Sequence, residues 1–253
     1  MKLQTNKNVF KSVGERITFL DEEFAIINKI CGEVCSFDEG KIDEGYLPKV
    51  FEKEICERLG KKPEIIECVN RIDKPVSGLV ILALTKRANA ELSNQLKIHK
   101  IQKVYYAIVE GCYKPFPVDK EACLLRHYLW FNSKNQKAYA SKKSEYQYKL
   151  AELRYRVVGA GERYSFLEIE LITGRTHQIR CQLSENKMPI KGDLKYGAKR
   201  SEKMGGIRLH AGKIALFHPV TKKYLEFFGD FPFEDNLWLE VKKSIKNIED
   251  LEK

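Results

Sequence analysis

Most apolar residues of the chain lie in short runs of strand length that are separated by polar turns. Residues 79–84 are apolar on both faces of an extended chain, which predicts a strand in the centre of a sheet. Residues 165–171 alternate between apolar and polar side chains, and this period of two predicts a strand with one buried face. Ala88, Leu92 and Leu96 recur every four positions, so we expect a helix directly after the central strand.

Further strands are expected near both ends of the chain and in its middle. Residues 24–28 form a short apolar run, and residues 104–109 are rich in β-branched and aromatic side chains. Residues 213–218 and 223–228 flank a turn that contains a proline, which predicts a hairpin. Because many strands are interrupted by few helices, the pattern favours an α+β fold with a mixed, largely antiparallel central sheet flanked by helices.

The chain contains no internal repeat and no low-complexity linker, so we expect one compact unit. We predict an arm at residues 1–16, a main domain at residues 17–240 and a tail at residues 241–253. Residues 113–150 are less regular, and lysines alternate there with tyrosines. We expect a hairpin or an insertion in that segment.

The chain is basic, since 45 Lys and Arg residues exceed 35 Asp and Glu residues and give a formal net charge of +10. An acidic partner, nucleic acid above all, is the functional interpretation of this excess. A lysine-rich solvated surface explains the charge equally well. No apolar run approaches the roughly 18 residues of a membrane span, and no signal peptide is recognisable, so we expect a cytoplasmic protein.

Several classes of chemistry are disfavoured by the motifs that the sequence lacks. There is no phosphate-binding P-loop, no G-x-G-x-x-G and no H-E-x-x-H, which argues against nucleotide hydrolysis and dinucleotide redox chemistry. The seven cysteines include no C-x-x-C pair, so reduced thiols are favoured over a disulfide frame or a zinc site.

Two polar segments stand out as candidate sites. Asp73 lies in a polar loop just before the central strand, where a scaffold can present a reactive group, although a lone Asp in a turn is more often a structural cap. Residues 173–180 gather two guanidiniums, an imidazole and an amide around an expected helix start, where free backbone N–H groups favour anions. An ordinary solvated helix start is the alternative for this second segment.

Six segments of the chain, in order, together resemble the RluA-type family of RNA pseudouridine synthases. They are Asp21 to Gly32, Asn70-Arg71-Ile72-Asp73 with Ser77-Gly78, Lys103 to Gly111, Thr173 to Arg180, Pro189 to Gly197, and Leu209-His210-Ala211 with Phe217-His218-Pro219. The likeness covers roughly residues 17–233. Asn70 departs from the family, which usually has His there; we expect Asn70 to bond to backbone instead, with altered loop packing and retained chemistry.

The resemblance implies that residues 17–240 isomerise uridine to pseudouridine in structured RNA, either ribosomal or transfer RNA. No cofactor and no metal is required, because the reaction is neither a redox step nor a hydrolysis. Asp73 matches the essential aspartate of the family, which could attack ribose carbon 1′ or remove the 2′ proton on a path through a glycal. Arg180 matches the arginine that pairs with that aspartate, and Tyr105 matches the active-site tyrosine.

The same resemblance implies contacts with RNA and leaves alternatives open. The residues expected to bind RNA are Arg71, Lys103, Arg175, His177 and Gln178, with Arg71 filling the place of a base that has been flipped out. We expect a monomer that needs no membrane and no nucleotide. The alternatives are a catalytically silent RNA-binding protein or RNA chaperone on the same fold, which the presence of Asp73, Tyr105 and Arg180 disfavours, and a hydrolase with Asp73 as nucleophile, which lacks a partner acid.

Overall fold

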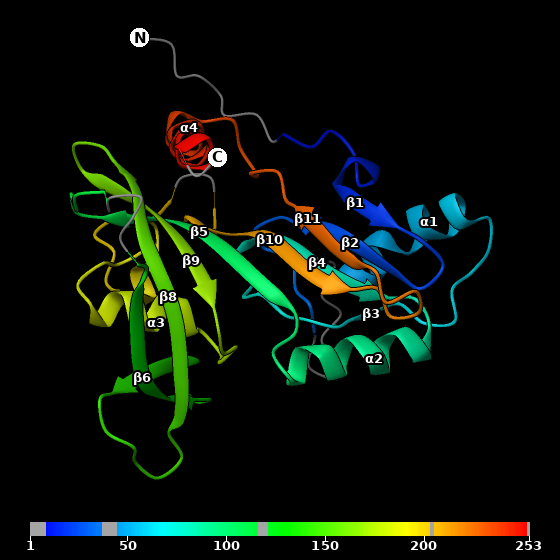
Figure 1. The fold of residues 1–253 in the computed structure, drawn as a ribbon, viewed down its shortest axis with the longest axis horizontal. Coiled ribbons are helices and arrows are strands. Elements are labelled where there is room, and N and C mark those ends of the chain that lie inside the picture. The colour runs from blue at the N-terminus through cyan, green and yellow to red at the C-terminus, as the bar shows by residue number, and fades with distance from the viewer. Residues whose placement is uncertain (1–8, 37–44, 116–120, 203–204, 252–253) are drawn as a thin grey trace. The chain divides into compact units, whose positions relative to one another are not determined.

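The computed structural model describes residues 9–36, 45–115, 121–202 and 205–251. They divide into two compact units (Figure 1). Unit 1 is formed by Met1–Lys103 and Ala211–Phe233, and unit 2 by Val104–His210 and Glu234–Lys253. Residues 1–8 of the predicted arm lie outside the described residues.

Unit 1 is a sheet with two helices. Its strand order is β1-β2-β4-β10-β11, with the short β3 also paired to β4. The strands and helices are β1 (Ile17–Leu20), β2 (Phe24–Lys29), α1 (Leu47–Leu59), β3 (Glu67–Cys68), β4 (Ser77–Ala83), α2 (Lys86–Lys97), β10 (Leu209–Phe217) and β11 (Tyr224–Phe228). The pairs β1–β2, β2–β4, β3–β4 and β10–β11 are antiparallel.

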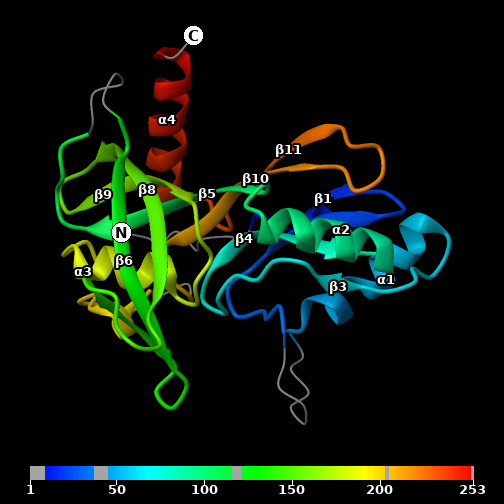
Figure 2. The ribbon, with the colours of Figure 1, turned by 60° about the horizontal axis from the view of Figure 1, so that its bottom comes forward.

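The central strand and the helix after it were both predicted correctly. Every residue of β4 is buried, as expected for a strand that is apolar on both faces. The hydroxyl of Thr85 accepts the backbone N–H of Ala88 at 3.1 Å and caps the N-terminus of α2. Ala88 and Leu92 then turn inward from α2 and pack against β4 (Figure 2).

A glycine is required where β4 begins. Gly78 has a φ of 114°, in the region that side chains disfavour. A Cβ atom at this position would lie 2.3 Å from the backbone oxygen of Ala211 on β10. Two motifs that lie far apart in the sequence, Ser77-Gly78 and Leu209-His210-Ala211, thus approach each other closely through their backbones.

Unit 2 is an antiparallel sheet with the strand order β5-β9-β8-β6-β7. Its strands and helices are β5 (Gln102–Glu110), β6 (Cys123–Asn132), β7 (Lys137–Ser141), β8 (Lys149–Ala160), β9 (Tyr164–Leu171), α3 (Gln178–Glu185) and α4 (Asn236–Leu251). The hairpin expected in residues 113–150 is β6–β7. On one face of this sheet, Leu129, Ala138 and Ala151 pack against Cys181 of α3.

Most of the segment predicted as a tail is helical. Residues 241–251 continue α4, and Val241 is fully buried. Ser244 lies against Gly159 near the end of β8, which fixes this helix on unit 2. In the described part of the chain, no helix is long and apolar enough to cross a membrane.

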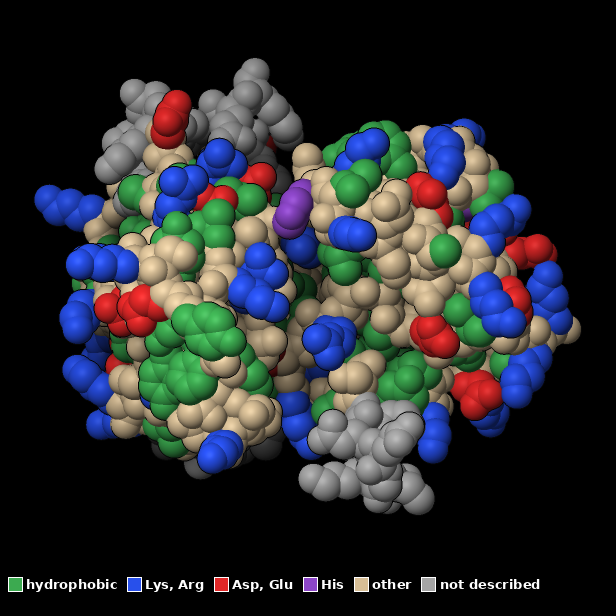
Figure 3. All heavy atoms as spheres, turned by 90° about the horizontal axis from the view of Figure 1, so that it is seen from below, with side chains coloured by type: hydrophobic (Ala, Val, Ile, Leu, Met, Phe, Trp, Pro, Cys, Tyr) green, Lys and Arg blue, Asp and Glu red, His purple; other side chains and the backbone are tan. Residues whose placement is uncertain are grey.

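Lys and Arg side chains are spread over the surfaces of both units that Figure 3 draws. Some basic groups are instead buried and paired. In unit 2, the Glu202 carboxylate accepts from Arg208 Nε at 2.8 Å and also bonds to Lys191, while Arg208 pairs with Asp235. Burial by itself would raise the pKa of Glu202, but the hydrogen bonds and charges of Arg208 and Lys191 outweigh it and lower the pKa to about 2.

The ionised Glu202 should make part of the stability of the protein depend on pH. Because the folded-state pKa lies below the usual value of 4.5, its contribution is complete above about pH 4.5 and is lost as the pH falls towards 2. We expect about 3 kcal/mol of the unfolding free energy to disappear over this window. Glu202→Gln should lower stability at pH 6 and flatten this part of the profile, as measured by urea unfolding. An unchanged slope between pH 4.5 and pH 2 in the variant would contradict the assignment.

Candidate active site

In unit 1, Asp73 lies in the loop that joins β3 to β4. Its side chain is half-buried, and its backbone oxygen accepts the N–H of Val76 at 2.9 Å, which closes a turn. Arg71, two residues earlier, is exposed. The loop thus holds the Asp73 carboxylate in a turn, and Arg71 lies two positions earlier in the sequence.

Lys29, the last residue of β2, is a buried lysine that binds the backbone of the Asp73 loop. The side chain is 1% exposed, and Nζ donates to three backbone oxygens, those of Ile30 at 3.1 Å, Lys74 at 3.1 Å and Val76 at 2.6 Å. Burial lowers the pKa of Lys29, while the charges of Cys35, Cys31, Glu33 and Asp73 partly oppose that shift. Three acceptors match the three donors of an ammonium group, so the charged form is fully hydrogen-bonded.

Two thiols lie against the same loop. Cys35 Sγ donates to the backbone oxygen of Ile72 at 3.7 Å. A hydrogen bond from Cys68 lowers the pKa of Cys35 to about 7, against the opposing effect of burial, and the pKa of Cys68 is raised. Cys35 is therefore the thiol of this pair that ionises first. All seven cysteines are free, as predicted.

Asn70 occupies the position where the resemblance leads one to expect His. It is 5% exposed, and its Oδ1 accepts the N–H of Ile81 at 2.8 Å. The expected bond from Asn70 to the backbone is thus confirmed. This bond ties the start of the loop to the middle of β4.

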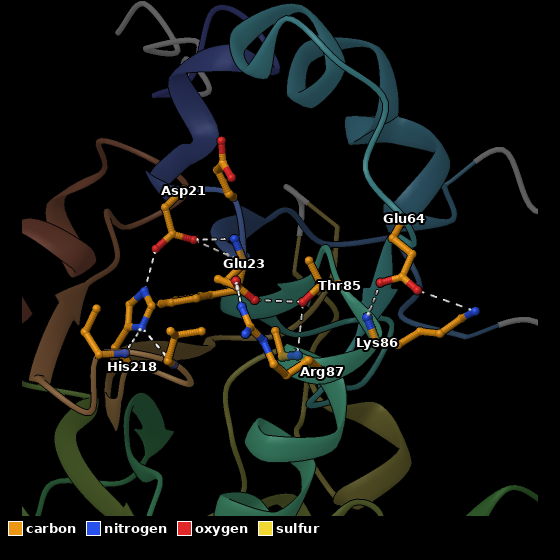
Figure 4. Close-up of polar contacts among 12 residues, drawn as sticks. Asp21, Glu23, Glu64, Thr85, Lys86, Arg87 and His218 are labelled. Atoms are coloured by element: carbon orange, nitrogen blue, oxygen red, sulfur yellow. Dashed lines mark hydrogen bonds and ion pairs between the residues drawn. The ribbon is translucent and has the colours of Figure 1, made fainter.

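A hydrogen bond between two side chains of unit 1 connects the turn before β2 to the turn between β10 and β11 (Figure 4). His218 Nε2 lies 2.8 Å from Asp21 Oδ2, and His218 Nδ1 accepts the N–H groups of Val220 and Thr221. Because Nδ1 accepts, Nε2 carries the proton and donates it to Asp21. The first and last of the six motifs meet at this bond.

In unit 2, Tyr105 and Tyr106 point to opposite faces of β5. Tyr105 lies opposite Ile169 and is 6% exposed, whereas Tyr106 lies opposite Glu168 and is half-buried. The next part of β5 also binds the Pro189–Gly197 segment, since the N–H of Glu110 donates to Pro189 O and that of Lys191 to Ile108 O. Tyr105 and this segment are therefore held by one strand.

Arg180 on α3 makes a bidentate ion pair with Asp193. Nε and Nη2 donate to Oδ2 at 2.7 Å and to Oδ1 at 2.8 Å, and both side chains are almost completely buried. The guanidinium carbon also lies 4.9 Å from the centre of the Tyr196 ring. These contacts leave the guanidinium in one orientation.

Tyr196 connects the helix start to the β6–β7 hairpin. Its hydroxyl accepts the N–H of Ala138 at 2.7 Å and lies 2.9 Å from His177 Nδ1. Burial raises the pKa of Tyr196, so the hydroxyl stays protonated at neutral pH and has a proton to donate to His177. His177 precedes α3 in a left-handed conformation, with a φ of 55°.

Among the residues expected to bind RNA, Gln178 and Arg175 make hydrogen bonds within the protein, and Lys103 is buried. The Gln178 amide is buried, with Oε1 accepting from Thr173 and from the Arg175 N–H and Nε2 donating to Glu152 O. These bonds favour a structural role for Gln178 over an RNA contact. Arg175 is exposed, although its Nε donates to Leu150 O at 3.0 Å. Lys103 is buried, and burial lowers its pKa, which is unfavourable for a phosphate contact on open surface.

A family model with the description RNA pseudouridylate synthase matches residues 23–185. The chain belongs to this family. It is 32% identical over 164 residues to the uncharacterized RNA pseudouridine synthase YlyB of Bacillus subtilis, which covers 65% of the chain and 52% of that protein. It is 30% identical over 228 residues to the ribosomal large subunit pseudouridine synthase D of Zymomonas mobilis, which covers 85% of the chain and 69% of that protein. The chain thus spans about half the length of YlyB.

The fold of a pseudouridylate synthase is also supported by solved structures. The human RNA pseudouridylate synthase domain containing 4 superposes with a TM-score of 0.70 at 19% identity, over 92% of the chain and 94% of that structure. The predicted family and the predicted α+β fold with a largely antiparallel sheet are both confirmed.

Some residues that shape the fold of this family member were present in the motifs but received no role from the sequence. Lys29 follows an apolar run, and Asp193 and Tyr196 lie in the Pro189–Gly197 segment. Two signals were available for these residues in the sequence. Lys29 ends an apolar run that was expected to form a strand, and Asp193 follows Gly192. Neither signal identifies the partners that come from other segments, which are Lys74 and Val76 for Lys29 and Arg180 for Asp193. The described residues contain no group of three His, Cys, Asp or Glu that could hold a metal ion.

Removal of the Lys29 ammonium should loosen the Asp73 loop. Lys29→Met leaves three backbone oxygens without their donor, and we expect a loss of at least about 2 kcal/mol of unfolding free energy. The N–H of Val76 should also exchange with deuterium faster. Lys49→Met, at an exposed position of α1, is the matched control and should behave as wild type. Wild-type exchange at Val76 in Lys29→Met would show that the ammonium does not hold the loop.

The buried pair of Arg180 and Asp193 should be sensitive to the loss of either charge. Asp193→Asn removes the carboxylate that the buried Arg180 guanidinium binds with two hydrogen bonds, and we expect about 3–5 kcal/mol of destabilisation in urea unfolding. The control is Glu170→Gln, which removes the partner of Arg154 from a pair that is half exposed on both sides. That change should cost less than about 1 kcal/mol. Equal effects of the two substitutions would contradict the importance of burial.

Proposed function

We propose that this protein isomerises uridine to pseudouridine in structured RNA. The bond between ribose carbon 1′ and uracil nitrogen 1 breaks, the base turns, and a bond forms from carbon 1′ to carbon 5. The proton leaves carbon 5 and nitrogen 1 gains one, so the step is neither an oxidation nor a hydrolysis. Membership of the family over residues 23–185, with Asp73 in its loop, carries this proposal.

Asp73 is proposed as the catalytic carboxylate. A carboxylate can add to carbon 1′ as a nucleophile or remove the 2′ proton as a base, and both routes stay open. In either role Asp73 must be ionised, and we propose Arg180 as its counter-charge. A guanidinium already oriented by Asp193 would lose little further freedom in such a contact.

Tyr105 is proposed to stack on the uracil and to act in proton removal from carbon 5. Its low exposure on a central strand supports a fixed position for the ring. For RNA binding, the exposed Arg71 is proposed to fill the space that a flipped base leaves. Arg175 and His177 are proposed as contacts to phosphate, Gln178 as their structural support, and Lys103 as the least favoured contact because it is buried.

Ribosomal RNA is the first substrate to test, because the relatives from Zymomonas mobilis and Vibrio parahaemolyticus are named ribosomal large subunit pseudouridine synthases D and C. Transfer RNA remains the second class. We propose that the protein acts as a monomer in the cytoplasm, without a nucleotide, metal or other cofactor.

Loss of the Asp73 carboxylate should abolish turnover without abolishing RNA binding. We expect Asp73→Asn to form no detectable pseudouridine in total RNA from cells that lack the protein, because an amide can neither attack carbon 1′ nor take a proton. The measurement is carbodiimide mapping of pseudouridine with and without purified protein. Lys74→Gln, at the exposed neighbouring position, is the control and should retain most of the activity.

Turnover by Asp73→Asn at the wild-type rate would overturn the role of Asp73. Absence of any new pseudouridine with the wild-type protein, despite measurable RNA affinity, would instead favour a silent RNA-binding protein. Folding of each variant is checked by circular dichroism, so that a loss of activity is not confused with unfolding.

A further inference from the structure

Three aromatic side chains form a cluster beside the β6–β7 hairpin of unit 2. The rings of Trp130 and Tyr139 are stacked, with centroids 5.9 Å apart and planes at 28°. Tyr148, just before β8, lies on the other side with its ring centroid 6.2 Å from that of Trp130. We call Trp130, Tyr139 and Tyr148 the aromatic platform.

The aromatic platform does not belong to the core of unit 2. Trp130 faces Tyr139 across the β6–β7 pair, while the residues that alternate with them, Leu129 and Ala138, turn to the opposite face and pack against α3. Tyr139 is 38% exposed, and Trp130 and Tyr148 are half-buried. α4 contacts β8 at its far end, near Gly159. Core packing therefore does not explain why three large rings are placed here.

Positive charge surrounds the aromatic platform. Residues 126–149 contain six Lys or Arg and one acidic residue, Glu145. Lys134, Lys142 and Lys143 are exposed, and Lys137 Nζ lies 5.8 Å from the centre of the Tyr139 ring. The surface therefore offers flat apolar faces within a basic rim.

We propose that the aromatic platform stacks unpaired bases of the RNA substrate while the surrounding lysines contact its phosphates. The inference rests on the proposed function, and it names a part of the protein that the family motifs do not include. Every base has a flat π face, so stacking on tryptophan and tyrosine binds single strands with little dependence on sequence. A partner protein is less well matched, because it would have to bring acidic groups to the rim and apolar groups to the centre. The polyanionic backbone and flat bases of RNA supply both at once.

The chain contains its own fluorescent reporter for this contact. It has two tryptophans, and the second, Trp238, is 2% exposed on α4. In Trp238→Phe, emission comes from Trp130 alone, and we expect saturable quenching by single-stranded oligouridylate. A hairpin of the same length with a fully paired stem should quench less. Trp130→Phe, in which only Trp238 emits, should show no quenching.

The contribution of the rings is measured by the fluorescence anisotropy of labelled oligouridylate at fixed salt. We expect Tyr139→Ala to weaken binding about 5- to 100-fold, which is the usual effect of losing one stacking side chain. Tyr139→Phe keeps the ring and should bind as wild type. Tyr224→Ala is the matched control, since Tyr224 is 48% exposed and rests on Phe217 in unit 1. That control should leave the affinity unchanged.

The rings and the lysines should differ in their dependence on salt. Substitution of both Lys142 and Lys143 by Gln should reduce the slope of log affinity against log salt by about 1.4, from about 0.7 for each phosphate contact to a single strand. Tyr139→Ala should lower the affinity at every salt concentration and leave the slope unchanged. A change of slope in the tyrosine variant would show that its effect is electrostatic and would overturn stacking.

The outcomes separate this inference from the proposed function. Wild-type affinity in both Tyr139→Ala and Trp130→Ala, or no quenching in Trp238→Phe, would overturn the platform whether or not the protein forms pseudouridine. Ring-dependent binding without any isomerisation of uridine would overturn the proposed function and leave the platform as an RNA-binding site.

Discussion

The two units depend on one constraint, that a charge taken out of water must find all its hydrogen-bond partners inside the protein. Lys29 meets this requirement with three backbone oxygens, and Arg180 meets it with both oxygens of Asp193. Lys29 finds two of its three acceptors, and Arg180 finds Asp193, in a later segment of the chain. The need to satisfy buried cations thus fixes the loops that hold Asp73 in unit 1 and the start of α3 in unit 2.

Patterns that depend on near neighbours in the sequence predicted much of the fold. The central strand β4, helix α2 and the β10–β11 hairpin follow from apolar spacing, a capping threonine and a proline turn, all of which act within a few residues. The candidate residues Asp73, Tyr105 and Arg180 were identified from the order of six segments that resemble the family motifs. Their loops and strands could be named in advance because each motif folds into one local piece of structure.

What the sequence did not reveal are partners that meet only after folding. Nothing local to Arg180 indicates Asp193, and nothing local to Asn70 indicates the Ile81 amide that it binds. Gln178 was expected to contact RNA because it lies in a family motif, and folding gives its amide three hydrogen bonds within the protein that the sequence did not indicate. Val241, in the segment expected to be a tail, is buried on α4. Polarity identifies a group that needs a partner, but only the folded chain identifies which partner it has.

Unit 1 is assembled from two stretches, Met1–Lys103 and Ala211–Phe233, with most of unit 2 encoded between them. The Gln95 side chain of α2, for example, bonds to both backbone groups of Phe217, 122 positions later. During translation, the first stretch therefore emerges from the ribosome without β10, and the backbone of β4 near Gly78 has no strand to meet until more than a hundred further residues have been added. The nascent chain carries an unfinished sheet edge throughout that time, a surface to which chaperones or other unfinished chains can attach.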